Sequence, residues 1–179
     1  MTHPLSDLRV LDRYKAAPFP PGYPTGYRTF YSPVDDVANV LLYLLESARS
    51  SLVVAMFGFD DPKLADVLQR KLLNENVFVQ LTLDKTQAGG VHERAILAKE
   101  NYPAASIAIG SSERGRIQHM KLAIIDNAVL VTGSTNWSDA AERLQDNQLT
   151  VISDARVAGE ARARIDAIHA NMLTKGQQQ

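Results

Sequence analysis

Short apolar runs alternate with segments of helical hydrophobic spacing along most of the chain. The apolar, β-branched runs predict buried strands at 28–31, 52–59, 77–83, 106–109, 122–125, 129–131 and 149–152. Apolar residues at helical spacing predict helices that begin near residues 35, 62, 91, 138 and 154. Because helices separate most of these strands, the pattern predicts a layered α/β/α sandwich with a mixed, mostly parallel central sheet.

Proline, glycine and tyrosine dominate the first 27 residues. The Pro-rich part cannot form a helix or a central strand, whereas residues 5–14 could form one or two helical turns. We expect an arm that packs over the domain through Phe19, Tyr23 and Tyr27, or that serves a partner. The predicted organisation is an N-terminal arm (1–27), one domain (28–174) and a disordered Gln-rich tail (175–179).

The composition is that of an ordinary globular domain, with 45% hydrophobic and 22% charged residues in a chain of 179. No apolar run approaches the length that spans a bilayer, and charged residues occupy the N-terminus where a secretory signal needs an apolar segment. The chain has no cysteine, which excludes a disulfide framework and a thiolate metal site. We therefore expect a cytoplasmic protein with no membrane partner, unless a signal peptide was removed before the first numbered residue.

Charge is unevenly distributed along the chain. The net charge of −1 argues against a strongly cationic nucleic-acid binder, but residues 85–121 carry six Lys or Arg against three Glu. A local positive field of this kind attracts a polyanion such as nucleic acid. The same charges are also compatible with an ordinary solvated surface.

The residues best suited to chemistry lie at the end of this basic segment. The run 122–125, the turn pair Asp126-Asn127 and the run 129–131 predict a β-hairpin. Side chains alternate along a strand, so His119 and Lys121 should point to the same face. Burying this pair without an anion is costly, and a phosphate suits both, because lysine neutralises its charge and histidine can attack phosphorus or protonate a leaving oxygen. A His-x-Lys pair alone is also typical of a solvated strand edge.

The surrounding pattern is much more specific than the pair. It reads His119-x-Lys121, four residues, Asp126, six residues, and Gly133-Ser134-x-Asn136. This pattern resembles the signature of the phospholipase D superfamily. The chain carries one copy, so it looks most like the short single-motif members, such as small bacterial endonucleases and Zucchini-type proteins. The tetrad Asp84-Lys85-Thr86-Gln87 is similar to one that often follows the corresponding strand in such members.

The resemblance implies a two-step phosphoryl transfer without a metal or other cofactor. His119 would attack the phosphodiester and form a phosphohistidine, and Lys121 would stabilise the charge on the non-bridging oxygens. Ser134 and Asn136 would hydrogen-bond the phosphate or orient its ligands. Asp126 completes the catalytic motif in a structural or electrostatic role.

Further candidate residues flank the motif. We add Arg116 and Gln118, which precede His119, as candidate substrate-binding residues. Bacterial endonucleases of the family commonly carry a glutamate that orients the nucleophilic histidine, and here Asn147, preceded by Asp146, stands at that position. Either Asp146 substitutes, or the histidine is tuned differently, or activity is reduced.

This mechanism needs two His/Lys sets, and the chain supplies one. The other histidines are His3, His92 and His169; none has a lysine two residues later, so we expect surface groups. A homodimer with two-fold symmetry, formed through the active-site face, would bring two copies of His119 into one site.

Three functions follow from these residues. The first is a dimeric, metal-independent endonuclease that hydrolyses DNA or RNA. The second is a phospholipase D-type hydrolase of a lipid phosphodiester, which needs an apolar or interfacial surface. The third is a weakly active nucleic-acid-binding module, for which Asn147 is the only argument.

Overall fold

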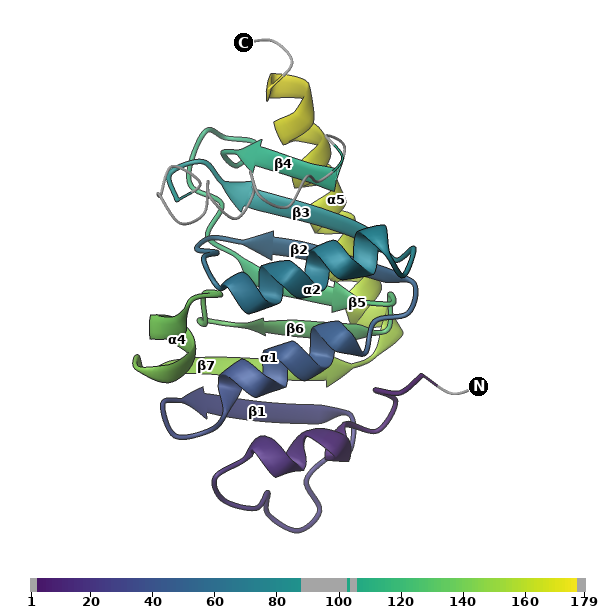
Figure 1. The fold of residues 1–179 in the computed structure, drawn as a ribbon, viewed down its shortest axis with the longest axis vertical. Helices are drawn as coiled ribbons and strands as arrows, with labels where there is room; N and C mark the ends of the chain where they lie inside the picture. The colour runs from purple at the N-terminus through teal and green to yellow at the C-terminus, as the bar shows by residue number, and fades with distance from the viewer. Residues whose placement is uncertain (1–2, 88–102, 104–105, 177–179) are drawn as a thin grey trace.

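The computed structural model describes residues 3–87, 103 and 106–176, and these form one layered α/β unit (Figure 1). A seven-stranded sheet has the order β1-β7-β6-β5-β2-β3-β4. Its strands are β1 (Tyr27–Ser32), β2 (Ser51–Met56), β3 (Phe78–Asp84), β4 (Ile107–Gly110), β5 (Lys121–Ile125), β6 (Val129–Gly133) and β7 (Asn147–Ser153). The helices are α1 (Val37–Glu46), α2 (Pro62–Leu73), α4 (Asp139–Arg143) and α5 (Ala155–Gly176), with a 3₁₀ helix η1 (Leu8–Tyr14).

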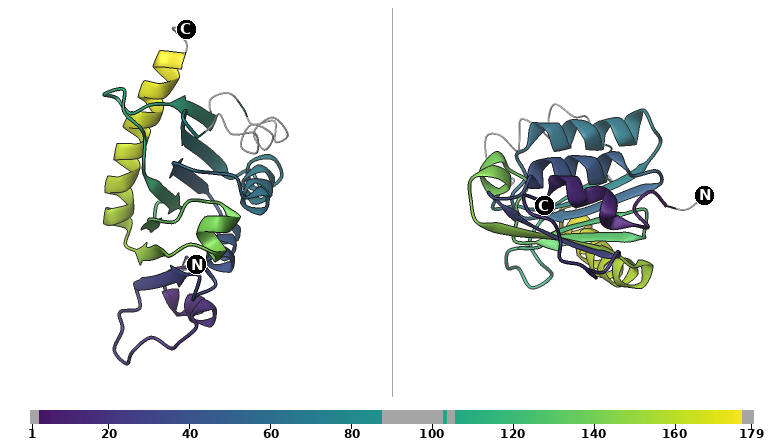
Figure 2. Two further views of the ribbon diagram at one scale, coloured as in Figure 1. Left: turned by 90° about the vertical axis from the view of Figure 1, so that its left-hand side faces the viewer. Right: turned by 90° about the horizontal axis from the view of Figure 1, so that it is seen from below.

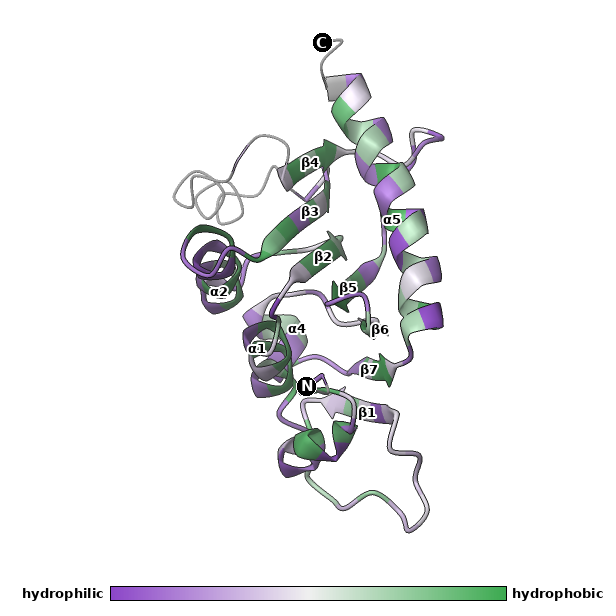
Figure 3. Cartoon of the chain, turned by 90° about the vertical axis from the view of Figure 1, so that its right-hand side faces the viewer, coloured by the Kyte–Doolittle hydropathy of each residue, from purple (hydrophilic) through white to green (hydrophobic). Residues whose placement is uncertain are grey.

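Helices cover both faces of the sheet, which confirms the predicted α/β/α layering. Helices α1 and α2 pack on one face and α5 on the other (Figure 2). The central strand β2 is buried along its whole length, and Figure 3 shows it as mainly hydrophobic. A strand covered on both faces reads as a continuous apolar run, which is why the sequence located β2, although the predicted run continued to residue 59 and the strand ends at Met56.

The expectation of a mostly parallel sheet is wrong. Only the pairs β2–β3 and β3–β4 are parallel, and the other four pairs of neighbouring strands are antiparallel. Parallel neighbours need a crossover that carries the chain back along the sheet, as α2 does between β2 and β3. The turn 126–128 reverses the chain directly from β5 into β6. The short helix α4 lies at the edge of the sheet and returns the chain into β7, so neither connection crosses over (Figure 1).

Leucines make the main attachment of the N-terminal arm to the domain, and Tyr23 adds contacts to the Phe19 ring and to Thr29 Oγ1. Leu5, Leu8 and Leu11 are fully buried in the same core as α1 and the sheet. Phe19 also packs against this core, as predicted, but Tyr27 is 45% exposed. The arm therefore packs on the domain, because η1 presents Leu8 and Leu11 to the core and Leu5 is buried just before the helix begins.

Some expectations fall outside the described residues. These are the helix predicted from residue 91, together with His92, and the last three residues of the tail. Helix α5 continues to Gly176, two residues into the segment expected as tail. In the part of the chain that is described, none of the helices combines the length and the apolarity needed to cross a bilayer.

Candidate active site

Most of the candidate residues lie at the ends of strands along one side of the sheet, which we call the site edge. Lys121 begins β5 opposite Met56, the last residue of β2. Gly133 ends β6, Asn147 begins β7 opposite Ser32, and Asp84 ends β3. These strand ends all lie along the left-hand edge of the sheet in Figure 1. The topology therefore brings together residues that come from separate parts of the sequence.

His119 and Lys121 lie on the same side at this edge, as their spacing predicts, and their side chains also touch. Lys121 Nζ lies 3.1 Å from His119 Nε2 and donates to the His119 carbonyl oxygen at 3.0 Å. His119 is exposed, whereas Lys121 is only 9% exposed. Burial lowers the pKa of the Lys121 ammonium below its usual range. Among the described residues no carboxylate pairs with Lys121, so the site holds a partly desolvated cation that an anion would stabilise.

Phe57 is a site residue that the sequence analysis missed. Its ring centroid lies 4.5 Å from that of His119 in an edge-to-face arrangement, and Lys121 Nζ lies 4.8 Å from the Phe57 centroid. Both contacts are of the favourable aromatic and cation–π kind. The predicted strand 52–59 included Phe57, but β2 ends at Met56. The pairing of Met56 with Lys121 places Phe57 beside the motif, and the local sequence pattern does not predict this pairing.

The Gly-Ser-x-Asn segment forms a tight turn against β7. Gly133 has φ +153°, and a Cβ there would lie 1.9 Å from the Gln148 carbonyl oxygen, so only glycine fits. Ser134 Oγ donates to Asn147 Oδ1 at 2.9 Å. Asn136 Oδ1 accepts from Gly58 N at 3.2 Å. No described acceptor bonds the Asn136 amide nitrogen, which leaves it able to donate to a phosphate.

Neither of the two residues considered as partners of His119 contacts it. Asn147 accepts from Ser134 and donates to the Ala141 carbonyl oxygen at 3.2 Å, so its amide supports the turn. Asp146 is exposed. Within the described residues the contacts that fix His119 come instead from Lys121 and Phe57.

Gln118 is part of the framework in this structure. It is 2% exposed, its Oε1 accepts from Met120 N at 2.5 Å, and its Nε2 donates to the Thr82 carbonyl oxygen at 3.3 Å. Its backbone N donates to Asp84 Oδ2 at 2.5 Å. The side chain expected to bind substrate is thus occupied by backbone groups, and it holds the loop before His119 in place. Arg116 differs, because its side chain is exposed at the same edge.

Asp126 lies at the opposite end of β5 from Lys121 and is not brought to the site. Its carboxylate accepts from the backbone N of Ser50 at 2.7 Å and of Ser51 at 2.9 Å, and from His3 Nε2 at 2.8 Å. Burial alone would raise the pKa of Asp126, but these hydrogen bonds outweigh it and lower the pKa to about 2. The motif aspartate therefore acts as the structural residue, tying the hairpin turn to the loop before β2.

The other described histidines are not surface groups, so that expectation is wrong. His3 is partly buried because it pairs with Asp126. His169 is 5% exposed because it lies on the inner side of α5, where Nδ1 contacts Thr82 Oγ1 at 2.9 Å. Neither contacts His119, so the described part of the chain offers one His/Lys set.

A buried acid lies behind the turn. Glu142 of α4 is 1% exposed, and burial, followed by the negative charge of Asp61, raises its pKa to about 8. Its carboxyl is therefore mostly protonated at neutral pH. No group of three or more His, Cys, Asp or Glu within the described residues is arranged to hold a metal ion.

A mixed sheet that brings a His/Lys pair and a Gly-Ser-x-Asn segment to one edge defines an α/β domain with a site suited to a phosphate group. A family model described as "Cardiolipin synthase, PLD-like domain" matches residues 41–169, which is more than half of the chain. The chain belongs to this phospholipase D-like family, as its motif predicted.

Individual relatives agree with this assignment. The chain is 32% identical over 139 residues to mouse (Mus musculus) mitochondrial cardiolipin hydrolase, covering 77% of this chain and 59% of that protein. Across the cardiolipin hydrolases from Chlamydomonas reinhardtii, dog and mouse, it spans 50% to 60% of their length.

Solved structures share the fold. The phospholipase D family member Nuc from Salmonella typhimurium aligns with a TM-score of 0.71 and 23% identity, covering 81% of this chain and 94% of Nuc. NucT from Helicobacter pylori aligns with a TM-score of 0.68 and 21% identity, covering 81% and 96%.

Proposed function

We propose that this protein is a metal-independent endonuclease that hydrolyses nucleic-acid phosphodiester bonds through a phosphohistidine, in a site shared by two subunits. The observation that carries this proposal is the His119–Lys121 contact at an exposed edge, without a described carboxylate as partner. A phosphodiester would supply the missing negative charge.

The chemistry follows from the groups at the edge. His119 attacks phosphorus, so that a P–N bond forms and the bond from phosphorus to the leaving oxygen breaks. A second His119, from the other subunit, gives its proton to that oxygen and then accepts one from water. The water oxygen attacks phosphorus and the P–N bond breaks, which restores the first histidine. Lys121 and the Asn136 amide stabilise the charge on the non-bridging oxygens.

Exposed apolar side chains support a dimer through this edge. Val34 is 70% exposed, Ile117 52% and Leu144 71%, and all three lie in loops at the edge that carries His119. Apolar side chains gathered on loops around one site are typical of a surface that becomes covered by a partner. A two-fold pairing of this edge would cover them and bring the two histidines together.

Basic side chains favour nucleic acid as the substrate. Arg114 and Arg116 are exposed in the loop that leads to His119, and Lys85 is exposed at the end of β3. A line of cations along one edge suits the regular charges of a nucleic-acid backbone.

The alternative substrate is a lipid phosphodiester. Its support is the similarity to proteins named mitochondrial cardiolipin hydrolase. A weakly active nucleic-acid-binding module is the third candidate, supported by the absence of an Asn147–His119 contact within the described residues.

The test is cleavage of labelled single- and double-stranded DNA and RNA in excess EDTA, with wild type, His119→Ala and His3→Ala compared. We expect turnover by wild type and by His3→Ala, whose histidine lies at the opposite edge, and none by His119→Ala. Turnover of cardiolipin-containing vesicles without cleavage of any nucleic acid would replace the proposal by the lipid alternative. Binding of nucleic acid without turnover would favour the third candidate.

A further inference from the structure

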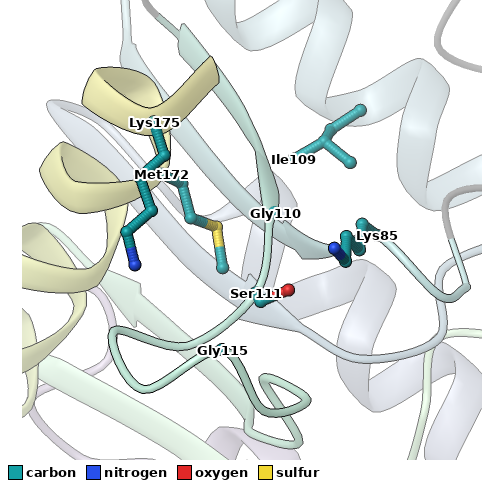
Figure 4. Close-up of a pocket in the computed structure, with 7 residues that line it drawn as sticks. All are labelled: Lys85, Ile109, Gly110, Ser111, Gly115, Met172 and Lys175. Atoms are coloured by element: carbon teal, nitrogen blue, oxygen red, sulfur yellow. The ribbon is translucent and has the colours of Figure 1, made fainter. Parts of the chain in front are cut away.

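A small cavity at the site edge is not used by the chemistry above. Its volume is about 230 Å³, and it lies where β4 ends, with β2 and β3 between it and β5 (Figure 4). The residues that line it include Lys85, Gly110, Ser111, Gly115, Met172 and Lys175. Pockets for whole small-molecule ligands usually measure about 300–1,000 Å³, so this one suits a single chemical group.

Two lysines from different elements give the cavity a positive rim. Lys85 follows β3 and Lys175 lies in the last turn of α5, and both are exposed. Lys175 Nζ donates to the Glu113 carbonyl oxygen at 3.1 Å, while the Glu113 carboxylate pairs with Arg164 at 2.7 Å. In the described part of the chain no carboxylate forms an ion pair with either lysine, and the Ser111 hydroxyl adds a neutral donor (Figure 4).

A cavity elsewhere on this edge lacks this character. It measures about 290 Å³, and its charged lining residues are Asp35, Asp36, Glu142 and Arg143. The cation among them, Arg143, already pairs with Asp139 at 2.8 Å. The basic cavity is therefore better suited than this one to a negatively charged group.

The floor of the basic cavity is built by a close approach of β4 and α5. A Cβ on Gly110 would lie 2.8 Å from Met172 Cγ, so glycine allows the end of β4 to pack against the helix. Met172 is 3% exposed and closes the floor with apolar atoms. The cavity thus combines an apolar base with cationic sides, which suits a phosphate that carries a sugar.

The position of the cavity is coupled to His119 through one carboxylate. Asp84 is fully buried, its Oδ2 accepts from Gln118 N at 2.5 Å, and its Oδ1 accepts from Thr86 N at 2.9 Å. Lys85 lies between Asp84 and Thr86, and His119 follows Gln118. Lys85 N also donates to the Gly110 carbonyl oxygen at 2.8 Å. Both loops are therefore held at a fixed separation.

We propose that this cavity binds a second phosphate of the strand whose scissile phosphate lies at His119 and Lys121. The inference rests on the proposed nuclease function and extends it, because it gives the site a preference for strands with more than one phosphodiester. Lys85 and Lys175 hold the phosphate oxygens, and Met172 contacts the attached sugar.

The test compares a dinucleotide, which has one phosphodiester, with a longer oligonucleotide for wild type and for the double variant Lys85→Ala, Lys175→Ala. We expect wild type to prefer the longer strand. The double variant should lower kcat/KM for the longer strand roughly tenfold more than for the dinucleotide, and reduce the slope of log KM against log salt by about 1 to 2. Arg156→Ala, which removes an exposed cation at the opposite edge, is the matched control and should keep both the preference and the slope.

Each outcome separates the two proposals. An unchanged length preference in a folded double variant, verified by circular dichroism, would overturn the second-phosphate site and leave the nuclease intact. Equal losses on both substrates would also overturn it, because they would indicate a general effect on the site. Wild type that cleaves neither substrate, yet hydrolyses cardiolipin in phosphatidylcholine vesicles, would overturn the nuclease and with it the strand-binding role of the cavity.

Discussion

Lys121 Nζ lies 3.1 Å from His119 Nε2, and the lysine is nearly buried while the histidine faces solvent. A charged ammonium can only donate, so His119 Nε2 is the acceptor in this contact. The arrangement orients the imidazole through the same nitrogen that would attack phosphorus. A phosphate that enters the site would compete for the Lys121 ammonium and release that nitrogen.

The first prediction concerns this pair. Lys121→Gln should reduce kcat by about 10²–10³-fold, because it removes the charge that stabilises the phosphate oxygens in the transition state. The matched control is Arg156→Gln, which removes an exposed cation from the first turn of α5 at the opposite edge and should leave kcat unchanged. Steady-state kinetics on a labelled oligonucleotide would measure both. A similar kcat for Lys121→Gln and wild type would contradict the assigned role.

Phe57 is predicted to position both members of the pair. Phe57→Leu keeps an apolar side chain but removes the ring that contacts His119 and Lys121, so we expect kcat to fall roughly tenfold with little change in KM. Phe57→Tyr keeps the ring and should restore kcat. If the two variants have equal thermal stability, a difference in kcat between them reflects positioning and not folding. Equal kcat values for Phe57→Leu and Phe57→Tyr would argue against a positioning role for the ring.

Local patterns were sufficient to predict the parts of the site that lie close in sequence. The two-residue spacing of His119 and Lys121 predicted that their side chains share a face, and the structure adds that they touch, although β5 begins only at Lys121. The Gly-Ser-x-Asn segment was visible as part of the family signature, and the structure explains its glycine, because Gly133 occupies a position that has no room for a side chain. The buried strands and the helical layers follow from hydrophobic periodicity.

Long-range pairing determines what the sequence analysis missed. Phe57 reaches His119 only because β2 and β5 pair antiparallel, and no local signal encodes that partnership. The mostly parallel sheet was inferred from alternating helices and strands, which does not show whether a connection crosses over. Gln118 was expected to bind substrate because the local sequence does not show its side-chain partner. That partner is the carbonyl oxygen of Thr82, which belongs to the distant strand β3.

Asp126 is predicted to stabilise the fold by an amount that decreases at low pH. Its folded pKa of about 2 lies below the ordinary 3.8, so its contribution is fully present above about pH 4 and is lost as the pH falls through about 2. Asp126→Asn should lower the free energy of unfolding by about 2 kcal/mol at pH 7. Urea unfolding at pH 7 and pH 3 should show a smaller difference at the lower pH. Glu160→Gln, at an exposed position of α5, is the control, and a pH-independent difference would contradict the assignment.

Glu142 is predicted to give the stability of the fold the opposite dependence on pH. Its folded pKa of about 8 lies above the ordinary 4.5, because burial and the charge of Asp61 disfavour the carboxylate. Between these pH values the unfolded chain releases the proton while the folded chain keeps it, so the stability of the wild type should decline as the pH rises from about 4.5 to about 8. Glu142→Gln carries a permanently neutral group of similar shape and should avoid this loss. We expect the variant to match the wild type near pH 4.5 and to exceed it near pH 8 by a few kcal/mol, on the order implied by the shift. Urea unfolding at the two pH values measures the difference, and a variant less stable than the wild type at pH 8 would show that the carboxylate is satisfied in the folded protein.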